Sequence, residues 1–331
     1  MNVVVYAVGK CYDITKNYGG LYMGNIYDGA FRTILNDCRQ MIIPVINEIF
    51  KEDYTGKEMI EFHPNEHFID QQDAADQKRI TDTNFIIYGK KKKKYHLECE
   101  SSLPDGRMTI RLFEYDAQIA LDEGEIINET LTVTFPNTAV LYLRSYKKTP
   151  DKMRYVIKTP GGSVEYDVPI MKVQEYTLED IFSKGLLLLI PFYIFSHEKN
   201  FNVYNNNEQM LAELKAEYQD ILRRLDKLEQ EEIIGAFDKR TIIELSGDVI
   251  REIAQKYENV QKGIGGMMSG ALLETEARTI LNKGRDEGRN ESKKETAIRM
   301  LQDGVLPIEK IAEYSGLDIA AVEQLGGLRT M

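Results

Sequence analysis

Two neighbouring stretches of the chain, residues 81–88 and 95–101, alternate polar and apolar positions and are joined by a polar, lysine-rich run. Such alternation on both sides of a polar connection predicts a β-hairpin. Because side chains alternate between the two faces of a strand, His96, Glu98 and Glu100 share one face of the second arm. The pattern therefore predicts a hairpin that carries a histidine and two carboxylates on a single side.

Asp82, on the first arm, falls on the same side as Glu98 if the register of the hairpin allows it. The carboxylates of Asp82, Glu98 and Glu100 would then converge beside His96. Hard divalent cations such as Mg²⁺ or Mn²⁺ favour all-oxygen sites of this kind, and like charges this close need a cation or a proton between them. The alternative is a solvated hairpin face on which acidic residues are scattered by chance.

The remaining pattern predicts an α/β fold with a mixed central sheet, followed by a helical C-terminal region. Apolar residues recur at helical spacing over 27–35, 42–50 and 108–121, and extended patterns cover 60–69, 139–144, 153–158 and 164–168. Helices, a block of three strands, a further helix and more strands suit a central sheet. The apolar run at 186–195 is too short to span a bilayer and is interrupted by Pro191, so it is interpreted as buried core.

The last third of the chain changes to charge-rich helical spacing. Residues 208–232 and 239–257 predict packed helices, 267–270 a flexible link, and 272–300 a long polar helix. Residues 307–325 predict two short helices about a glycine-containing turn, the outline of a helix-turn-helix. Its second helix has no basic residue, which favours a packing or partner module over direct reading of DNA.

These changes in pattern divide the chain into four segments. They are an N-terminal extension at 1–22, an α/β domain at 23–204, a helical region at 205–266, and a long polar helix with a small helical-hairpin tail at 267–331. Self-association is expected through the helices of 208–260, whose apolar positions form one stripe.

Composition narrows the function classes. The 331 residues are 43% hydrophobic and 29% charged, with a formal net charge of −11, so any DNA-binding surface must be local. Three cysteines without paired spacing predict no disulfide and a reducing, cytoplasmic location. The four histidines lack zinc-ligand spacing. No apolar stretch is long enough to span a membrane, so no membrane association is expected.

Five segments resemble one protein family. They read YDGAFR (27–32), DTNFIIY (82–88), YHLECESS (95–102), RLFEYD (111–116) and GRDEGR (284–289). This set resembles the Rpn-type recombination-promoting nucleases, also called PD-(D/E)XK nuclease family transposases, from about residue 25 to the C-terminus. The short Asp…Glu-x-x pattern is weak by itself, whereas the ordered set of five segments is fairly specific.

The resemblance implies a PD-(D/E)XK core of order αβββαβ at 23–204 and a metal-dependent DNA endonuclease. Asp82 and Glu98 would hold Mg²⁺ or Mn²⁺, and Glu100 would lie at the edge of the site as a further ligand or proton acceptor. In some members of the superfamily a helix-borne glutamate joins the metal site, which makes Glu48 a further candidate. The alternative for Glu48 is a solvated position on an amphipathic helix.

The chain departs from the family pattern at Glu100, where the family has Lys or Gln. A glutamate cannot supply the positive charge of that lysine. Arg111 and Gln118 lie on the helix predicted after the hairpin and could supply the missing group, with His96 supporting the site. Alternatively, Arg111 pairs only with Glu114 or Asp116 nearby.

DNA is the partner that the resemblance implies. Arg107 and Arg111, with the lysine run at 90–94, would meet its phosphates; the run is otherwise a solvated turn. A second hypothesis is a catalytically weak or inactive transposase-derived protein that acts by binding DNA or protein partners. It is based on Glu100 and the acidic composition. A third is a purely structural helical assembly protein.

Overall fold

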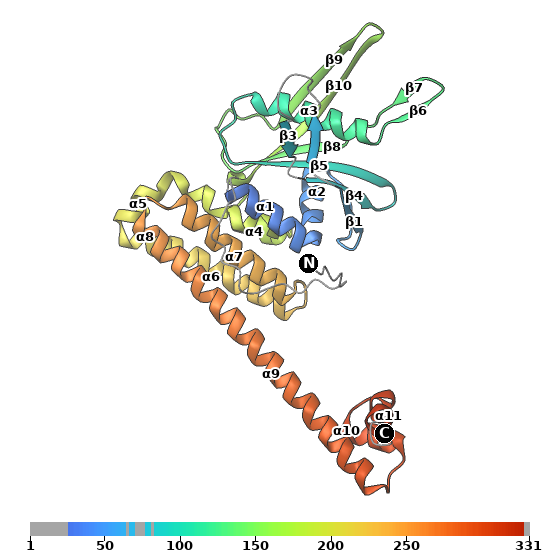
Figure 1. Ribbon diagram of the computed structural model, residues 1–331. Helices are drawn as coiled ribbons and strands as arrows, with labels where there is room; N and C mark the ends of the chain where they lie inside the picture. Colours follow the sequence, from blue (N-terminus) through green and yellow to red (C-terminus); the bar gives the residue numbers. More distant parts are fainter. Residues whose placement is uncertain (1–25, 64–65, 70–76, 81–82, 328–331) are drawn as a thin grey trace, which may run out of the picture.

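A mixed six-stranded sheet forms the centre of the protein, and a helical C-terminal region follows it (Figure 1). The computed structural model describes residues 26–63, 66–69, 77–80 and 83–327. The sheet has the order β1, β4, β5, β8, β10, β9. Its strands are β1 Met59–Phe62, β4 Thr83–Tyr88, β5 Lys92–Glu100, β8 Asn137–Tyr142, β9 Lys152–Thr159 and β10 Gly162–Lys172; a separate antiparallel pair is formed by β2 Glu66–Ile69 and β3 Gln77–Ile80. The predicted α/β class with a mixed sheet is confirmed.

The sheet changes from antiparallel to parallel pairing at β5. β1 pairs with β4 and β4 with β5 in antiparallel fashion, whereas β8 is parallel to both β5 and β10, and β9 is antiparallel to β10. A parallel neighbour needs a crossover connection, and α3, Arg107–Asp122, supplies it between β5 and β8. The carboxyl ends of β5 and β8 therefore lie side by side, with Glu100 opposite Tyr142.

The predicted hairpin is present, but its turn is shorter than the lysine run. Main-chain pairing continues to the end of β4, where Tyr88 lies opposite Lys92. Residues 92–94 are therefore strand residues of β5 rather than part of the connection.

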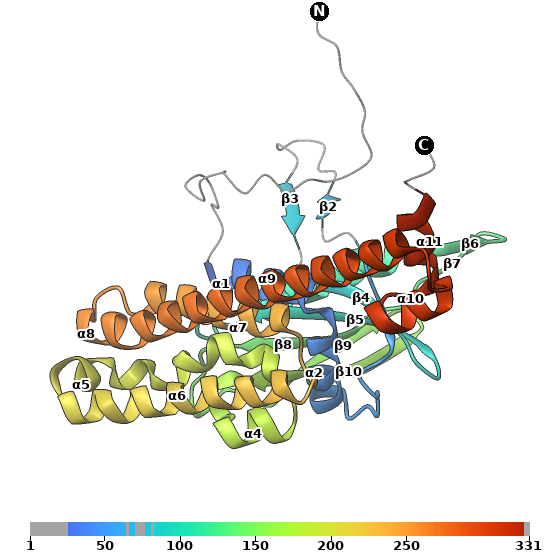
Figure 2. The same cartoon turned by 90° about the horizontal axis from the view of Figure 1, so that it is seen from below.

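Helices cover the sheet face that carries Tyr95, Leu97 and Cys99. They are α1 Ile26–Asp37, η1 Arg39–Met41, α2 Ile42–Phe50, η2 Val173–Glu175, α4 Leu178–Ser183, η3 Leu187–Asn200, α5 Phe201–Asn206, α6 Glu208–Gln230 and α7 Ala236–Ile253. These helices and this face contribute to one hydrophobic cluster. Figure 2 shows α6 and α7 side by side on the helical side of the sheet. The apolar run at 187–195 is buried in the cluster, which confirms the prediction of core.

The helical region at 205–266 shares this core with the sheet. Leu214, Tyr218 and Ile221 of α6 and Ile242 of α7 belong to the same hydrophobic cluster as the sheet face. Their apolar stripe is therefore buried inside the chain, which removes the basis for expecting self-association through 208–260. The predicted extension at 1–22 lies outside the described residues.

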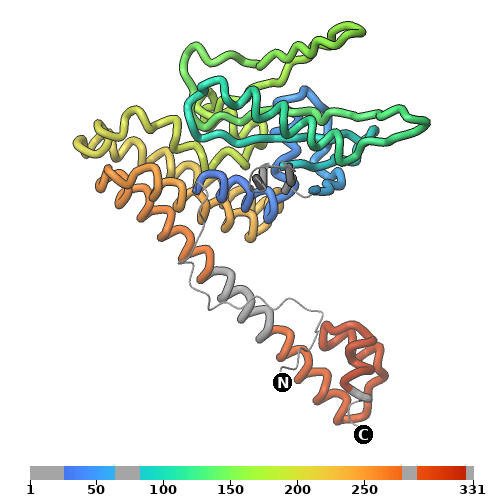
Figure 3. Tube along the Cα trace, turned by 45° about the horizontal axis from the view of Figure 1, so that its top comes forward, coloured from blue at the N-terminus to red at the C-terminus, as the bar shows by residue number. Residues whose placement is uncertain are grey.

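The opposite sheet face is covered by α3. Met108 and Leu112 of α3 pack against Val140, Tyr142 and Tyr155 in a second, smaller cluster. A short hairpin of β6 Glu125–Ile127 and β7 Thr130–Thr132 follows α3. This hairpin and the β9–β10 hairpin extend outward beyond the sheet (Figure 3).

The C-terminal region is dominated by one long helix. After α8 Glu258–Val260 and the π-helical turn η4 Gln261–Gly265, α9 runs over Gly266–Asp303 and is followed by α10 Ile308–Ser315 and α11 Ile319–Gly327. The prediction of a flexible link at 267–270 is wrong, because these residues form the first turn of α9. Ala297, Ile311, Ala312 and Val322 form a small separate cluster at the far end. Within the described ranges, no helix is both long and apolar enough to cross a bilayer.

Candidate active site

The polar face of β5 lies buried beneath α3. His96 and Glu98 are 0% and 2% exposed, and Asn84 of β4 lies opposite His96. Alternation along β5 places Leu97 and Cys99 in the large core and therefore turns His96, Glu98 and Glu100 to the other side. The predicted common face of these three residues is thus present.

A chain of hydrogen bonds ties Glu98 to the helix above it. His96 Nε2 lies 3.1 Å from Glu98 Oε1, and His96 Nδ1 lies 2.7 Å from Asp116 Oδ1. The Thr138 hydroxyl of β8 donates to the same Asp116 oxygen at 2.6 Å. Burial alone would lower the pKa of His96, but the hydrogen bonds to Asp116 and Glu98 outweigh it and raise the pKa to about 9. At neutral pH His96 is therefore an imidazolium that donates to both carboxylates.

Asp116 is a site residue that the sequence analysis named only as an alternative partner of Arg111. It is 1% exposed, although it is a carboxylate in the middle of a helix. It follows Met108 and Leu112 at intervals of eight and four residues, so it lies on the buried stripe of α3. The sequence signal that could have identified Asp116 was an acidic residue at a position of the otherwise apolar stripe of this helix.

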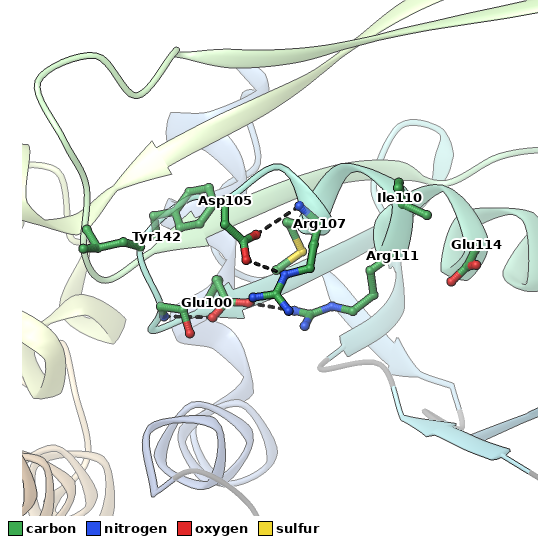
Figure 4. A pocket seen from close by; sticks show the side chains of 10 residues that line it. Glu100, Asp105, Arg107, Ile110, Arg111, Glu114 and Tyr142 are labelled. Carbon is green, nitrogen blue, oxygen red and sulfur yellow. Dashed lines mark hydrogen bonds and ion pairs between the residues drawn. The ribbon is translucent and has the colours of Figure 1, made fainter.

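Arg111 joins Glu98 and Glu100 at the open end of this face, and Figure 4 shows its contact with Glu100. Its guanidinium lies 3.0 Å from Glu100 Oε2 and 3.7 Å from Glu98 Oε2. The Ser102 amide donates to Glu100 Oε1 at 2.8 Å, which fixes the second oxygen of that carboxylate. Burial would lower the pKa of Arg111, but the charges of Glu98 and Glu100 outweigh it and raise the pKa. Arg111 thus faces the carboxylates of β5, which is the first of the two expectations for it.

A further carboxylate, Asp28, comes from the first turn of α1. Burial raises the pKa of Asp28, and the nearby charges of Glu100 and Glu98 raise it further, while Arg32 and Arg111 lower it. The sequence analysis quoted Asp28 within a family-like segment without assigning it to the site. Its position became apparent only from the packing of α1 near the end of β5.

Three other predicted site residues have partners elsewhere or are exposed. Glu48 accepts hydrogen bonds from Lys184 at 2.8 Å and from Tyr176 at 3.3 Å. Gln118 donates to Asp122, one turn further along α3, at 2.8 Å. Arg107 has a side chain that is 90% exposed and pairs with the neighbouring Asp105. Glu48 and Gln118 are therefore not among the residues gathered at the site.

Asp82, the remaining predicted carboxylate, lies outside the described residues. Within the described part of the chain, no group of three His, Cys, Asp or Glu side chains has metal-binding spacing. The carboxylate oxygens of Asp28, Glu98, Glu100 and Asp116 are nevertheless ligands of the kind that a hard cation favours, and the cationic groups near them include His96, Arg111 and Arg32.

A pocket of about 470 Å³ opens beside Glu100. Figure 4 shows Glu100 and Arg111 at its base, with Arg107 and Asp105 along one side and Tyr142 behind. Its wall combines two arginines with the apolar side chains of Leu103 and Met108. A polymeric ligand bound across this pocket would contact two guanidinium groups and apolar side chains next to the carboxylates.

Comparison of the chain with protein-family models, with curated proteins and with solved structures gives no match. The function must therefore be argued from the geometry of this site together with the resemblance of the sequence segments.

Proposed function

We propose that the protein is a metal-dependent DNA endonuclease of the PD-(D/E)XK type. The observation that carries the proposal is the convergence of Glu98, Glu100 and Asp28 around Arg111 at the end of β5. Two carboxylates at alternate positions of one strand, with more acidic groups from a neighbouring helix, form an oxygen-rich site that suits Mg²⁺ or Mn²⁺.

The order of the elements supports the same proposal. Helix α2 precedes three antiparallel strands, β1, β4 and β5; α3 then crosses over to β8, which is parallel to β5. Within the six-stranded sheet this resembles the αβββαβ order expected of the core, with the β2–β3 pair inserted before β4 and the β6–β7 hairpin inserted before β8. It places the acidic positions of β5 beside the crossover helix, where Arg111 and Asp116 can reach them.

Asp82 is proposed as the second principal carboxylate. Thr83, the first described residue of β4, lies opposite Leu97. Asp82 directly precedes Thr83 in the sequence, and the family resemblance assigns the first metal-binding carboxylate to it. This expectation concerns a residue outside the described ranges and is part of the test below.

Each residue has a defined task in this proposal. Glu98, Asp82 and Asp28 would bind the divalent ion, which when bound supplies Lewis-acid stabilisation and a water of lowered pKa. The His96–Asp116 pair orients the Glu98 carboxylate by holding its Oε1. Arg111 supplies the positive charge near the scissile phosphate that the family expects from the position of Glu100.

The test is plasmid nicking by the purified protein in Mg²⁺ or Mn²⁺. We expect nicking that EDTA abolishes and that Glu98→Gln or Asp82→Asn reduces by roughly 100-fold or more. Glu165→Gln is the matched control, because Glu165 is an exposed glutamate of strand β10 that pairs with Arg154 of β9. Equal activity of Glu98→Gln and Glu165→Gln would contradict the proposal.

The second candidate is a catalytically quiet DNA-binding protein. It is favoured by one observation: Arg111 already neutralises Glu98 and Glu100 at 3.7 and 3.0 Å. If the purified protein binds DNA but does not nick it in Mg²⁺ or in Mn²⁺, this alternative is supported.

A further inference from the structure

Arg144, which follows β8, makes an unusually complete set of contacts near the candidate site. Its Nε and Nη2 atoms each donate to the Glu198 carboxylate of η3 at 2.7 Å. Its Nη1 donates to the main-chain oxygen of Ser101 at 2.7 Å. The guanidinium also stacks 4.6 Å from the centre of the Phe195 ring and 5.7 Å from that of Tyr27. A bidentate pair with two ring contacts fixes an arginine in one orientation.

The groups that Arg144 holds are the immediate neighbours of two site carboxylates. Ser101 follows Glu100 at the end of β5, and Tyr27 precedes Asp28 in the first turn of α1. These two segments belong to different elements that pack near each other. Arg144 is a single rigid group in contact with both of them, and Glu198 and Phe195 tie it to the helical core.

We infer that Arg144 is a positioning residue that sets the separation of Asp28 and Glu100 and thereby the affinity of the site for a divalent cation. The inference rests on the proposed metal-dependent function. Arg144 acts on these carboxylates through the Ser101 carbonyl and the Tyr27 ring. Residues that orient metal ligands in this way typically change affinity by about 10- to 100-fold when they are removed.

The direction in which the cation affinity changes when Arg144 is replaced separates a positioning role from a purely electrostatic one. Removal of a positive charge near a cation site should strengthen cation binding by Coulomb's law. Loss of positioning should weaken it. The double variant Arg144→Gln/Glu198→Gln leaves the net charge unchanged, because one cation and one anion are removed together, and so isolates the positioning effect.

The experiment measures Mn²⁺ binding to the full-length protein by isothermal titration calorimetry, with the melting temperature recorded for every variant. Arg224→Gln is the matched control. Arg224 donates to Asp220 at 2.7 Å and Glu179 at 3.0 Å and stacks 5.1 Å from the centre of the Phe182 ring. Its side chain is 29% exposed, against 24% for Arg144. The two substitutions should therefore cost similar stability.

We expect Arg144→Gln and the double variant to weaken Mn²⁺ binding by about tenfold or more, and Arg224→Gln to leave it unchanged. Unchanged or tighter binding by Arg144→Gln, or equal weakening by Arg224→Gln, would overturn the inference. If Arg144→Gln does not fold, Arg144→Lys decides, since it keeps the positive charge but loses the bidentate pair with Glu198, and unchanged affinity would again refute the idea. Absence of Mn²⁺ binding by the wild type would overturn the nuclease proposal as well, so the two failures are distinguishable.

Discussion

Glu100 is the residue at which the sequence departs from the nuclease-family pattern that it resembles, and the structure gives it two firm partners. Arg111 lies 3.0 Å from one carboxylate oxygen, and the Ser102 amide donates to the other. Glu100 therefore weakens the positive charge that Arg111 is proposed to supply near the phosphate. A side chain without charge at this position would release Arg111 for that role.

This leads to a prediction for Glu100→Gln and Glu100→Lys. We expect both to nick DNA faster than the wild type at saturating Mn²⁺, because they free Arg111 and remove one negative charge from the acidic cluster. One electrostatic group of this kind is typically worth roughly 2.7–4 kcal/mol, and a fraction of that is measurable as a rate.

Saturating metal is essential to this comparison, since a weaker cation affinity would otherwise hide the gain. Glu114→Gln is a suitable control, because Glu114 lines the same pocket but comes from α3. A rate that is unchanged or lower in both Glu100 variants would mean that Glu100 is a metal ligand or that the site is not built as proposed.

At the scale of elements, the His96–Asp116 contact joins β5 to α3 through a buried charged pair. The pKa of His96 is raised to about 9, above its ordinary value of 6.5. A group with a raised folded-state pKa contributes stability that is fully present below its unfolded pKa and is lost as pH rises through the folded pKa. The pair should therefore stabilise the protein fully at pH 6 and progressively less towards pH 9 and above.

Asp116→Asn tests this link between strand and helix. We expect the variant to lose about 3 kcal/mol of unfolding free energy at pH 6, because it removes one of the two carboxylate charges beside a buried imidazolium. The loss should shrink at pH 9.5, where His96 is largely neutral in the wild type. Urea denaturation at the two pH values measures it, and Asp122→Asn, an exposed aspartate on the same helix, is the control. A loss that is the same at both pH values would show that the charge of His96 is not involved.

At the scale of the whole molecule, the hydrophobic clusters divide the chain into a main body and a small distal unit. The sheet and the helices through the start of α9 share one large cluster, whereas α10, α11 and the end of α9 form their own. Figure 1 shows α9 connecting the two, with α10 and α11 far from the sheet. A defect in the distal cluster should therefore stay local.

We predict that Ile311→Ala unfolds only this distal unit. Ile311 is 1% exposed in a cluster of four buried residues, and removal of such a side chain typically costs about 2–5 kcal/mol. Hydrogen exchange should accelerate in α10 and α11 and remain unchanged in β5. Ile308→Ala, at a position of the same helix that is 37% exposed, should change neither. Faster exchange in β5 would show that the distal unit and the sheet fold together.

The sequence by itself determined the features that depend on local periodicity. Alternation in β5 fixes Glu98 and Glu100 on one face, and helical spacing fixes α3 and the face that carries Arg111, because these periods are properties of the backbone itself. The mixed α/β class follows from the order of such elements. The short turn of the hairpin and the continuous start of α9 were missed, since lysine and glycine runs carry weak local preferences that pairing and packing override.

Only the tertiary structure decided which distant groups meet. Asp28 and Glu48 are both acidic residues on neighbouring helices, yet Asp28 faces the carboxylates of β5, while Glu48 is held by Lys184, 136 residues away. Asp116 was recognisable as unusual, but its partner His96 was not, because hydrogen bonds between elements depend on how α3 lies across the sheet. Periodicity assigns a side chain to a face; packing between elements, which no local pattern encodes, assigns its partner.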